Sequence, residues 1–206
     1  MLRSLPKIYP ITDTRLSGLS HAEQVERFAE GGATLIQLRD KLASPREFYE
    51  AALEAMKTAR RLGVQIIIND RVDIAVAVEA DGVHLGQNDL PVEQARIILG
   101  ENRIVGFSTH TLKQALEASF KAIDYLAIGP VFHTTTKENP DPVVGLEGLR
   151  EVKRQIAKPL VAIGGITLER AKSVIEAGAD SVAVISDLYS TGDIAGRVRE
   201  LFGLFK

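Results

Sequence analysis

Basic side chains alternate at the end of one apolar run of the sequence. Gln37, Arg39 and Lys41 are spaced two apart, so in an extended strand they share one face. Two cations on one face repel each other unless an anion lies between them, and Arg and Lys both bind phosphate oxygens. The alternative is that Lys41 already lies in a loop and that Arg39 pairs with Asp40 or another carboxylate.

Two carboxylates, Asp70 and Asp89, follow the next two apolar runs. Mg²⁺ usually binds one or two carboxylates together with water and the oxygens of a substrate phosphate. A pair of carboxylates near several cations therefore fits a metal-bound diphosphate. The alternatives are that Asp70 is a cap or turn residue before the helix that follows it and that Asp89 caps a helix beginning near Pro91. Asn69 could orient a ring nitrogen or amino group, or only shape the turn.

A second candidate anion site lies toward the end of the chain. Gly164-Gly165 ends one apolar run and Ser186 ends the next. Glycine lets the backbone approach phosphate oxygens closely, and a serine can add a hydroxyl donor. Between the two candidate sites runs a long segment, 132–145, with three threonines and Lys137. Long ordered loops of this kind often bind ligands; the alternatives are a plain turn for the glycines and a loose insertion for this segment.

Short apolar runs alternate with longer amphipathic stretches along the whole chain, which predicts parallel strands covered on both faces. Helix starts between them are marked by capping boxes at Ser20 and Ser44. We expect strands over Lys7–Thr12, Thr34–Asp40, Gln65–Asp70, Gly82–Gly86, Arg103–Ser108, Tyr125–Val131, Leu160–Gly165 and Ser181–Ser186.

Eight strand–helix units in one chain predict a compact single-domain α/β fold, a (β/α)8 TIM barrel over residues 1–206. The alternative is an open, doubly wound sheet, but no Gly-x-Gly-x-x-Gly turn follows the first strand. A barrel gathers the carboxyl ends of its strands at one rim, where its active site lies. The polar segments described above all fall at those ends, so we expect them to share one cavity.

Composition narrows the class of protein. The chain has 206 residues, 45% of them hydrophobic, and its net charge is −2. This is typical of a globular protein and offers no basic surface for nucleic acid. Cysteine is absent, which excludes thiolate catalysis and cysteine-ligated metals. No apolar segment approaches the ~20 residues of a membrane span, and the N-terminus does not resemble a signal peptide. We therefore expect a cytoplasmic protein with no membrane partner; the sequence leaves room for a homo-oligomer.

Histidines are few. His84 lies inside a predicted strand, so we expect a packed, hydrogen-bonded side chain rather than a ligand. His21 begins a predicted helix and is expected to face solvent. His110 falls at the predicted rim, where it could act as an acid or base or support other residues.

The chain resembles the thiamine-phosphate synthase family from end to end. The matching stretches are Tyr9–Asp13, Gln37–Lys41, Ile68–Asp73, Asp81–Asp89, Gly106–Thr111, Gly129–Lys137, Ala162–Ile166 and Val184–Ser186. Each is short, but their order and spacing together are specific. One departure is His133, where proline is more usual in the family.

The resemblance implies a transferase that joins a hydroxymethylpyrimidine diphosphate to a thiazole phosphate, or its carboxylated form, and releases pyrophosphate. It implies Mg²⁺ held by Asp70 and Asp89, and Arg39, Ser108 and Lys137 as the catalytic residues. The resemblance further implies pyrimidine diphosphate contacts from Gln37, Leu38, Arg39, Asp40, Lys41, Asn69, Ser108 and Lys137. Thiazole phosphate contacts are implied for Thr134, Thr135, Thr136, Gly165, Ile185 and Ser186.

Three other functions compete with this one. A related thiazole tautomerase would share the barrel and the Gly-Gly turn, but would have no diphosphate to hold. A non-catalytic protein that binds a thiamine precursor would need no metal. A sugar-phosphate isomerase would need one phosphate site and a dedicated general base.

Overall fold

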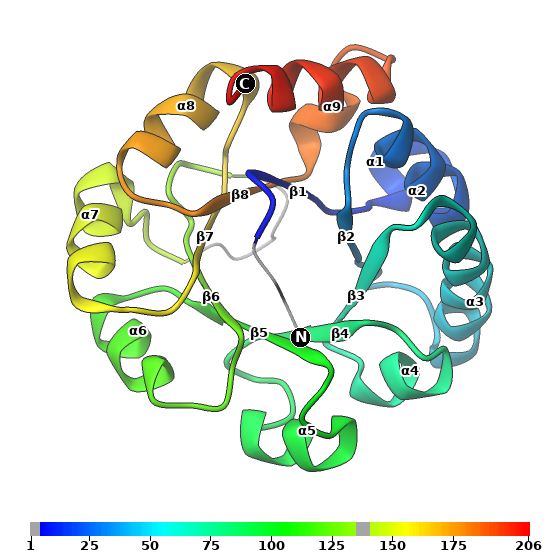
Figure 1. The fold of residues 1–206 in the computed structure, drawn as a ribbon, viewed down its shortest axis with the longest axis horizontal. Helices are drawn as coiled ribbons and strands as arrows, with labels where there is room; N and C mark the ends of the chain where they lie inside the picture. The colour runs from blue at the N-terminus through cyan, green and yellow to red at the C-terminus, as the bar shows by residue number, and fades with distance from the viewer. Residues whose placement is uncertain (1–4, 135–140) are drawn as a thin grey trace.

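The structure is a computed structural model that describes residues 5–134 and 141–206. Within them, eight parallel strands form a barrel with helices around it (Figure 1). The strands are β1 (Ile8–Pro10), β2 (Leu35–Leu38), β3 (Gln65–Asn69), β4 (Gly82–Leu85), β5 (Ile104–Thr109), β6 (Tyr125–Ile128), β7 (Leu160–Ile163) and β8 (Ser181–Val184). The barrel predicted from the sequence is confirmed, and each expected strand is present.

The strands pair in a continuous parallel series from β2 through β3, β4, β5, β6, β7 and β8 to β1. Between β1 and β2 the barrel closes by a parallel bridge from Ile11 to Gln37, with the Thr12 N–H donating to the Gln37 carbonyl at 2.9 Å. An open sheet would leave these two edges unpaired. The closure therefore decides between the two folds that the sequence allowed.

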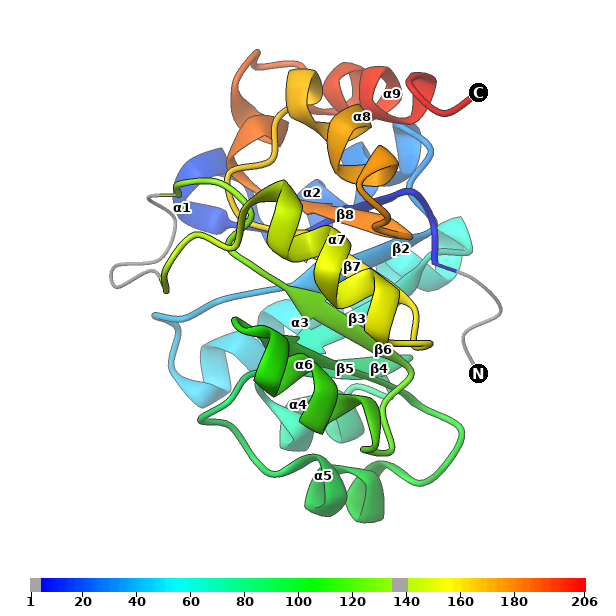
Figure 2. The same cartoon turned by 90° about the vertical axis from the view of Figure 1, so that its left-hand side faces the viewer.

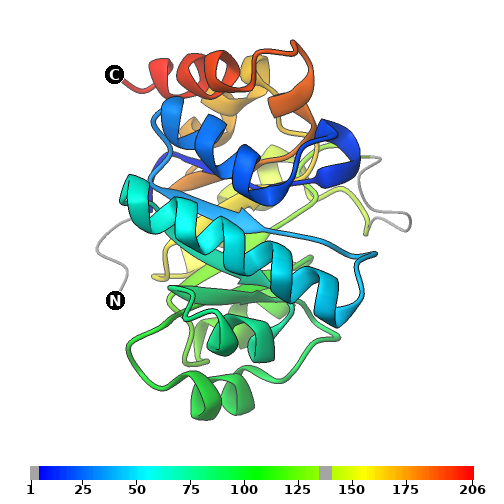
Figure 3. The same ribbon diagram turned by 90° about the vertical axis from the view of Figure 1, so that its right-hand side faces the viewer.

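Helices alternate with the strands and form the outer ring. They are α1 (Thr14–Ser17), α2 (His21–Glu30), α3 (Pro45–Leu62), α4 (Val72–Ala77), α5 (Val92–Leu99), α6 (Leu112–Ser119), α7 (Gly145–Gln155), α8 (Leu168–Glu176), the 3₁₀ turn η1 (Ser186–Tyr189) and α9 (Ile194–Gly203). Figure 2 shows α6 and α7 across the outside of the strands, and Figure 3 shows the long α3 beside α2. Both predicted capping boxes are present: Ser20 and Ser44 each accept from the backbone of a glutamate three residues on.

Side chains of the strands alternate between two cores. The larger core lies between the strands and the helices and contains residues such as Leu38, Ile66 and Val105. A smaller set points into the barrel; it comprises Tyr9, Ile11, Leu35, Ile67, Ile104, Tyr125, Ala127, Val161 and Ala183. This alternation follows from the two-residue period of a strand. The inner set includes small side chains, which leaves space toward one end of the barrel.

Most strands end one to three residues earlier than the sequence predicts, because the chain turns there to form the rim. At the end of β7, for example, Gly164 and Gly165 take the positive φ values of +100° and +62° that leave the strand conformation. Across the described part of the chain, no helix is both long enough and apolar enough to cross a membrane.

Candidate active site

A cavity of about 440 Å³ opens at the carboxyl ends of the strands. Every strand, or the loop after it, contributes to its wall, as the barrel architecture requires. Eleven of the residues selected from the sequence line it: Gln37, Arg39, Lys41, Asn69, Asp70, Asp89, Ser108, Thr134, Gly165, Ile185 and Ser186. Their convergence on one cavity makes it the candidate active site.

The remaining selected residues lie elsewhere. Leu38 is fully buried in the outer core, so its side chain faces away from the cavity. Asp40 does not line the cavity, and its carboxylate accepts from the N–H groups of Leu42 and Ala43, at 2.9 Å each. Three predicted contacts, Thr135, Thr136 and Lys137, lie outside the described residues.

Asp70 and Asp89 form a carboxylate pair at the ends of β3 and β4. Neither caps a helix, because the N-termini of α4 and α5 have no side-chain cap. Asp70 accepts instead from the ammonium of Lys41, and Asp89 accepts from the Gly86 N–H at 2.6 Å. The alternative that both aspartates serve as helix caps is therefore excluded.

Burial and mutual repulsion make the two carboxylates costly to keep charged together. Burial raises the pKa of Asp70 above its usual value; the neighbouring Asp89 raises it further, while Lys41 opposes the shift. Asp70 also has a φ of +62°, which is unusual for a residue with a side chain and is typical of functional sites. The fold thus holds a partly desolvated carboxylate beside a second one, at an energetic cost that a bound cation would relieve.

The donor set fits Mg²⁺ better than a transition metal. Within residues 5–134 and 141–206, no three His, Cys, Asp or Glu side chains are grouped so that they could hold a metal ion. Two carboxylates are the number that Mg²⁺ takes when substrate phosphates and water complete its shell. The ion pair between the Lys41 ammonium and Asp70 shows that this carboxylate stabilises a positive charge next to it.

Arg39 projects toward the cavity from the end of β2. Its guanidinium Nη1 lies 3.6 Å from the Asp13 carboxylate, and β2 ends at Leu38. The alternative from the sequence is therefore correct in that Arg39 pairs with a carboxylate, Asp13 rather than Asp40, and Lys41 lies in the loop after the strand. The Arg39 backbone N–H donates to Thr12 Oγ1 at 3.1 Å, which ties the segment after β2 to the end of β1. Asp13 partly balances the charge of Arg39, and neither side chain is fully exposed.

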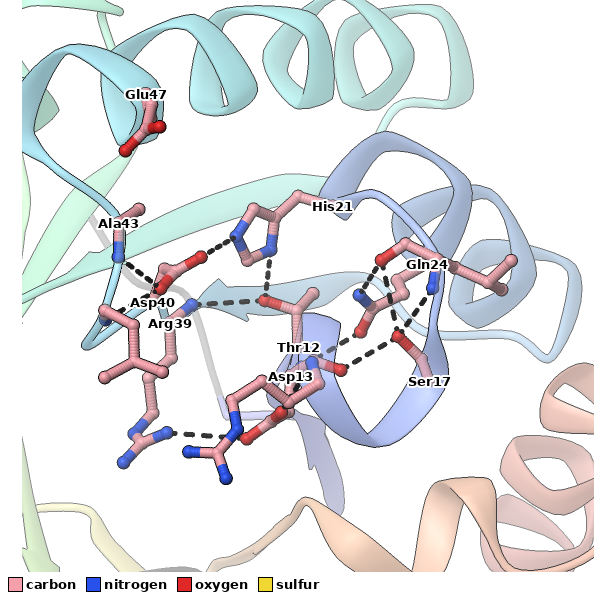
Figure 4. A network of polar contacts seen from close by, with 12 residues as sticks. Thr12, Asp13, Ser17, His21, Gln24, Arg39, Asp40, Ala43 and Glu47 are labelled. Carbon is pink, nitrogen blue, oxygen red and sulfur yellow. Dashed lines mark hydrogen bonds and ion pairs between the residues drawn. The ribbon is translucent and has the colours of Figure 1, made fainter.

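A buried polar network contacts the segment after β2 (Figure 4). The Nδ1 atom of His21 is hydrogen-bonded to Thr12 Oγ1 at 2.8 Å, and its Nε2 lies 3.7 Å from the Asp40 carboxylate. Burial lowers the pKa of His21, against the influence of Asp40. The expectation that His21 faces solvent is wrong, since it is only 1% exposed. The start of α2 packs under the loop after β2, a contact that no local sequence pattern reports.

The opposite side of the cavity is formed by β6, β7 and β8. Gly165 approaches the backbone so closely that a Cβ atom there would lie 2.3 Å from the His133 carbonyl oxygen. Arg170 of α8 was not selected from the sequence, but it donates to the Gly165 carbonyl at 2.8 Å and its guanidinium lies 4.7 Å from the ring centroid of Phe132. This arrangement holds the glycine turn beside Ile185 and Ser186, which line the same cavity.

Histidines also reach the cavity. His110 is hydrogen-bonded through Nδ1 to the Gly129 carbonyl at 2.7 Å and lies 3.5 Å from the Asp141 carboxylate. His84 is 7% exposed and hydrogen-bonded through both ring nitrogens, as expected for a packed histidine. It also lines the cavity, together with Tyr9 and Tyr125, which the sequence did not single out. These tyrosines appear in the sequence only as strand residues of the core.

Comparison with known proteins agrees with the geometry. The family model of thiamine monophosphate synthase matches residues 8–188. The thiamine-phosphate synthase of Chloroflexus aurantiacus is 46% identical over 199 residues, which cover 96% of this chain and 92% of that protein. The thiamine-phosphate synthase of Clostridium novyi is 47% identical, with 95% and 96% of the two chains covered.

A solved structure gives the same result for the fold. The thiamine phosphate pyrophosphorylase of Pyrococcus furiosus superposes with a TM-score of 0.87 at 42% identity, over 96% of this chain and 94% of the other. By its sequence, its fold and the residues gathered at the rim of its barrel, the chain belongs to the thiamine monophosphate synthase family.

Proposed function

We propose that this chain is a thiamine-phosphate synthase, a transferase with two small-molecule substrates. It joins 4-amino-2-methyl-5-(diphosphooxymethyl)pyrimidine to 4-methyl-5-(2-phosphoethyl)thiazole, or to its carboxylated form with loss of carbon dioxide, and releases pyrophosphate. Family membership supports the reaction. The observation that carries the proposal is the single cavity, which has cations and paired carboxylates on the side of β2, β3 and β4 and a glycine turn on the side of β7 and β8.

The two sides divide the substrates between them. The pyrimidine diphosphate would bind beside Arg39, Lys41, Asn69 and Ser108, which supply cationic and neutral donors for phosphate oxygens and ring atoms. The thiazole phosphate would bind at the glycine turn, where backbone N–H groups can approach the oxygens closely. Ile185 and Ser186 complete this side, and Thr134 also lines the cavity.

Residues of the site would stabilise the leaving group rather than transfer a proton. The bond from the pyrimidine methylene carbon to the diphosphate oxygen breaks, and the electron pair leaves with pyrophosphate. The aminopyrimidine ring stabilises the resulting cation, and the thiazole nitrogen donates its lone pair to form the new carbon–nitrogen bond. Arg39, Lys41, Lys137 and the Ser108 hydroxyl would neutralise or hydrogen-bond the departing oxygens, and fixed donors of this kind need no reorganisation during the reaction.

Asp70 and Asp89 would hold one Mg²⁺ ion. When bound, the ion supplies positive charge to the diphosphate. The raised pKa of Asp70 implies that protons compete with the ion up to a higher pH than at an ordinary aspartate, so affinity for Mg²⁺ should rise with pH through this range. We include in the proposal the cytoplasmic location and the single catalytic domain expected from the sequence.

Pyrophosphate release tests the proposal directly. The purified protein, mixed with both substrates, should release pyrophosphate and form thiamine phosphate only when Mg²⁺ is added. Asp89→Asn should weaken the response to Mg²⁺, whereas Glu54→Gln, which removes a carboxylate from an exposed ion pair on α3, should leave it unchanged. Thiamine phosphate formed at full rate in chelator would exclude the metal, and absence of the product under all conditions would exclude the synthase.

A further inference from the structure

The floor of the cavity contains a continuous line of polar side chains contributed by five strands. Gln37 Nε2 lies 3.2 Å from the Tyr9 hydroxyl, and the Tyr9 and Tyr125 hydroxyls are 3.0 Å apart. The Tyr125 hydroxyl lies 2.9 Å from His84 Nδ1, and His84 Nε2 lies 2.8 Å from Ser108 Oγ. Of these five residues only Ser108 is more than slightly exposed, so the line runs from the closed interior of the barrel to the cavity.

Packing fixes the positions of the three rings in this line. His84, Gly106 and Tyr125 are register neighbours on β4, β5 and β6. A Cβ atom at Gly106 would lie 2.1 Å from Cζ of Tyr125, so the glycine leaves the space that the tyrosine ring fills. The rings of His84 and Tyr125 stack with centroids 5.5 Å apart, and Tyr9 meets Tyr125 edge-on at 5.9 Å.

Hydrogen-bond donors and acceptors can be assigned along the line from its interior end. The amide nitrogen of Gln37 can only donate, so the Tyr9 oxygen accepts from it. The one proton of Tyr9 then goes to Tyr125; the reverse would leave the Tyr9 proton without an acceptor among the described residues. The proton of Tyr125 goes to Nδ1 of His84.

His84 is then left with a proton on Nε2 if the ring is neutral. Because Nδ1 accepts the proton of Tyr125, it has no proton of its own and the ring is neutral. The burial of His84, which lowers its pKa, acts in the same direction. A neutral ring that accepts at Nδ1 must donate at Nε2, and the atom within reach of Nε2 is Ser108 Oγ. The Ser108 oxygen is thereby occupied as an acceptor, and its own proton is free to donate into the cavity.

We propose that His84 is a positioning residue whose Nε2–H orients the Ser108 hydroxyl, so that Ser108 presents its proton to the diphosphate oxygens. The opposite tautomer would draw the Ser108 proton toward His84 and turn an oxygen lone pair toward an anionic substrate, which would repel it. This inference rests on the proposed function for the identity of the anion. The tautomer of His84 is a property of the free protein and can be tested separately.

Nitrogen-15 NMR of the uniformly labelled wild-type protein tests the tautomer without any substrate. The chain has four histidines, and the signals of His84 are those that disappear in the His84→Gln variant. The couplings of the ring nitrogens to the ring protons should identify a neutral ring with its proton on Nε2 at pH 7. A proton on Nδ1, or a charged ring, would overturn the proposal whether or not the protein makes thiamine phosphate.

Kinetics of paired variants test the role of His84 in catalysis. Ser108→Ala should lower kcat by roughly 10²-fold, as expected for loss of one fixed donor. His84→Asn should lower kcat similarly, because the short asparagine side chain cannot place its amide nitrogen where Nε2 of His84 lies. His84→Gln can place an amide N–H near that position and should therefore recover much of the loss.

The double variant separates positioning from a general effect on the fold. If His84 acts through Ser108, adding His84→Asn to Ser108→Ala should lower kcat by less than about 2-fold further. A further loss as large as that of His84→Asn alone would show that the two residues act independently and would contradict the proposal. The KM for the thiazole phosphate should stay the same in all these variants, because β7 and β8 are untouched.

Discussion

Replacement of Gly165 by alanine should impair both the stability of the fold and the binding of one substrate. Gly165 has a φ of +62°, and a Cβ atom there would lie 2.3 Å from the His133 carbonyl oxygen and 2.9 Å from Phe132 Cβ. An alanine in this left-handed conformation costs roughly 1–2 kcal/mol. Because the nearest atom belongs to the backbone, relief requires the loop after β6 to move, which adds about 1–3 kcal/mol.

The expected total is a loss of about 2–5 kcal/mol in the free energy of unfolding. The loop displaced by the new methyl group carries Thr134 into the same cavity. The KM for the thiazole phosphate should therefore rise at least about 10-fold, which corresponds to 1.4 kcal/mol of lost binding. The KM for the pyrimidine diphosphate should change little, since its proposed donors lie on β2 to β5.

Gly63 provides a matched control. It ends α3 with a φ of +69°, close to that of Gly165, but apart from its own chain neighbours no atom of the described residues lies within 4 Å of the position of its Cβ. Gly63→Ala should therefore show only the conformational cost and normal kinetics. Urea unfolding followed by circular dichroism measures the first quantity, and steady-state pyrophosphate release measures the second. Equal losses of stability in the two variants, together with an unchanged KM for the thiazole phosphate, would refute the close-approach argument.

Three further predictions concern charges in and near the cavity. Because burial raises the folded-state pKa of Asp70, its ionised form lowers the free energy of unfolding at neutral pH, and this loss disappears as the pH falls. Asp70→Asn should therefore raise the melting temperature of the protein without metal. For the wild-type protein, Mg²⁺ and pyrophosphate at 100 times their dissociation constant should raise the melting temperature by roughly 5–10 °C, and Asp70→Asn should abolish this increase. Lys137→Ala should lower turnover by about 10²–10³-fold, and near wild-type turnover in the steady state would remove Lys137 from the mechanism. Folding lowers the pKa of His84 from 6.5 to about 4, so the unfolded chain binds a proton at a higher pH than the folded protein does. The free energy of unfolding of the wild-type protein should therefore fall by about 3 kcal/mol between pH 7 and pH 4 because of this residue. His84→Gln should lack this part of the loss in urea titrations at the two pH values, and identical losses in the two proteins would count against a buried neutral ring.

Local patterns in the sequence were sufficient to predict much of the molecule. The eight apolar runs predicted the strands because burial on both faces requires nearly continuous apolar sequence. The capping boxes at Ser20 and Ser44 predicted the starts of α2 and α3, since those hydrogen bonds join residues three apart. Once a barrel is expected, its geometry alone predicts that Arg39, Asp70 and Ser108 share a rim, and the structure brings them to one cavity.

Contacts between distant segments could not be predicted in this way. His21 is buried because the start of α2 packs against the loop after β2, and Asp40 supports that loop instead of lining the cavity. The order of donors from Gln37 to Ser108 depends on side chains from five strands, separated in sequence by up to 116 residues. The two-residue period of a strand depends only on neighbouring residues, so a sequence pattern can show which residue types stand at each strand end. Which atoms face one another, and therefore which proton each group carries, is decided only when the barrel closes and water is excluded from its interior.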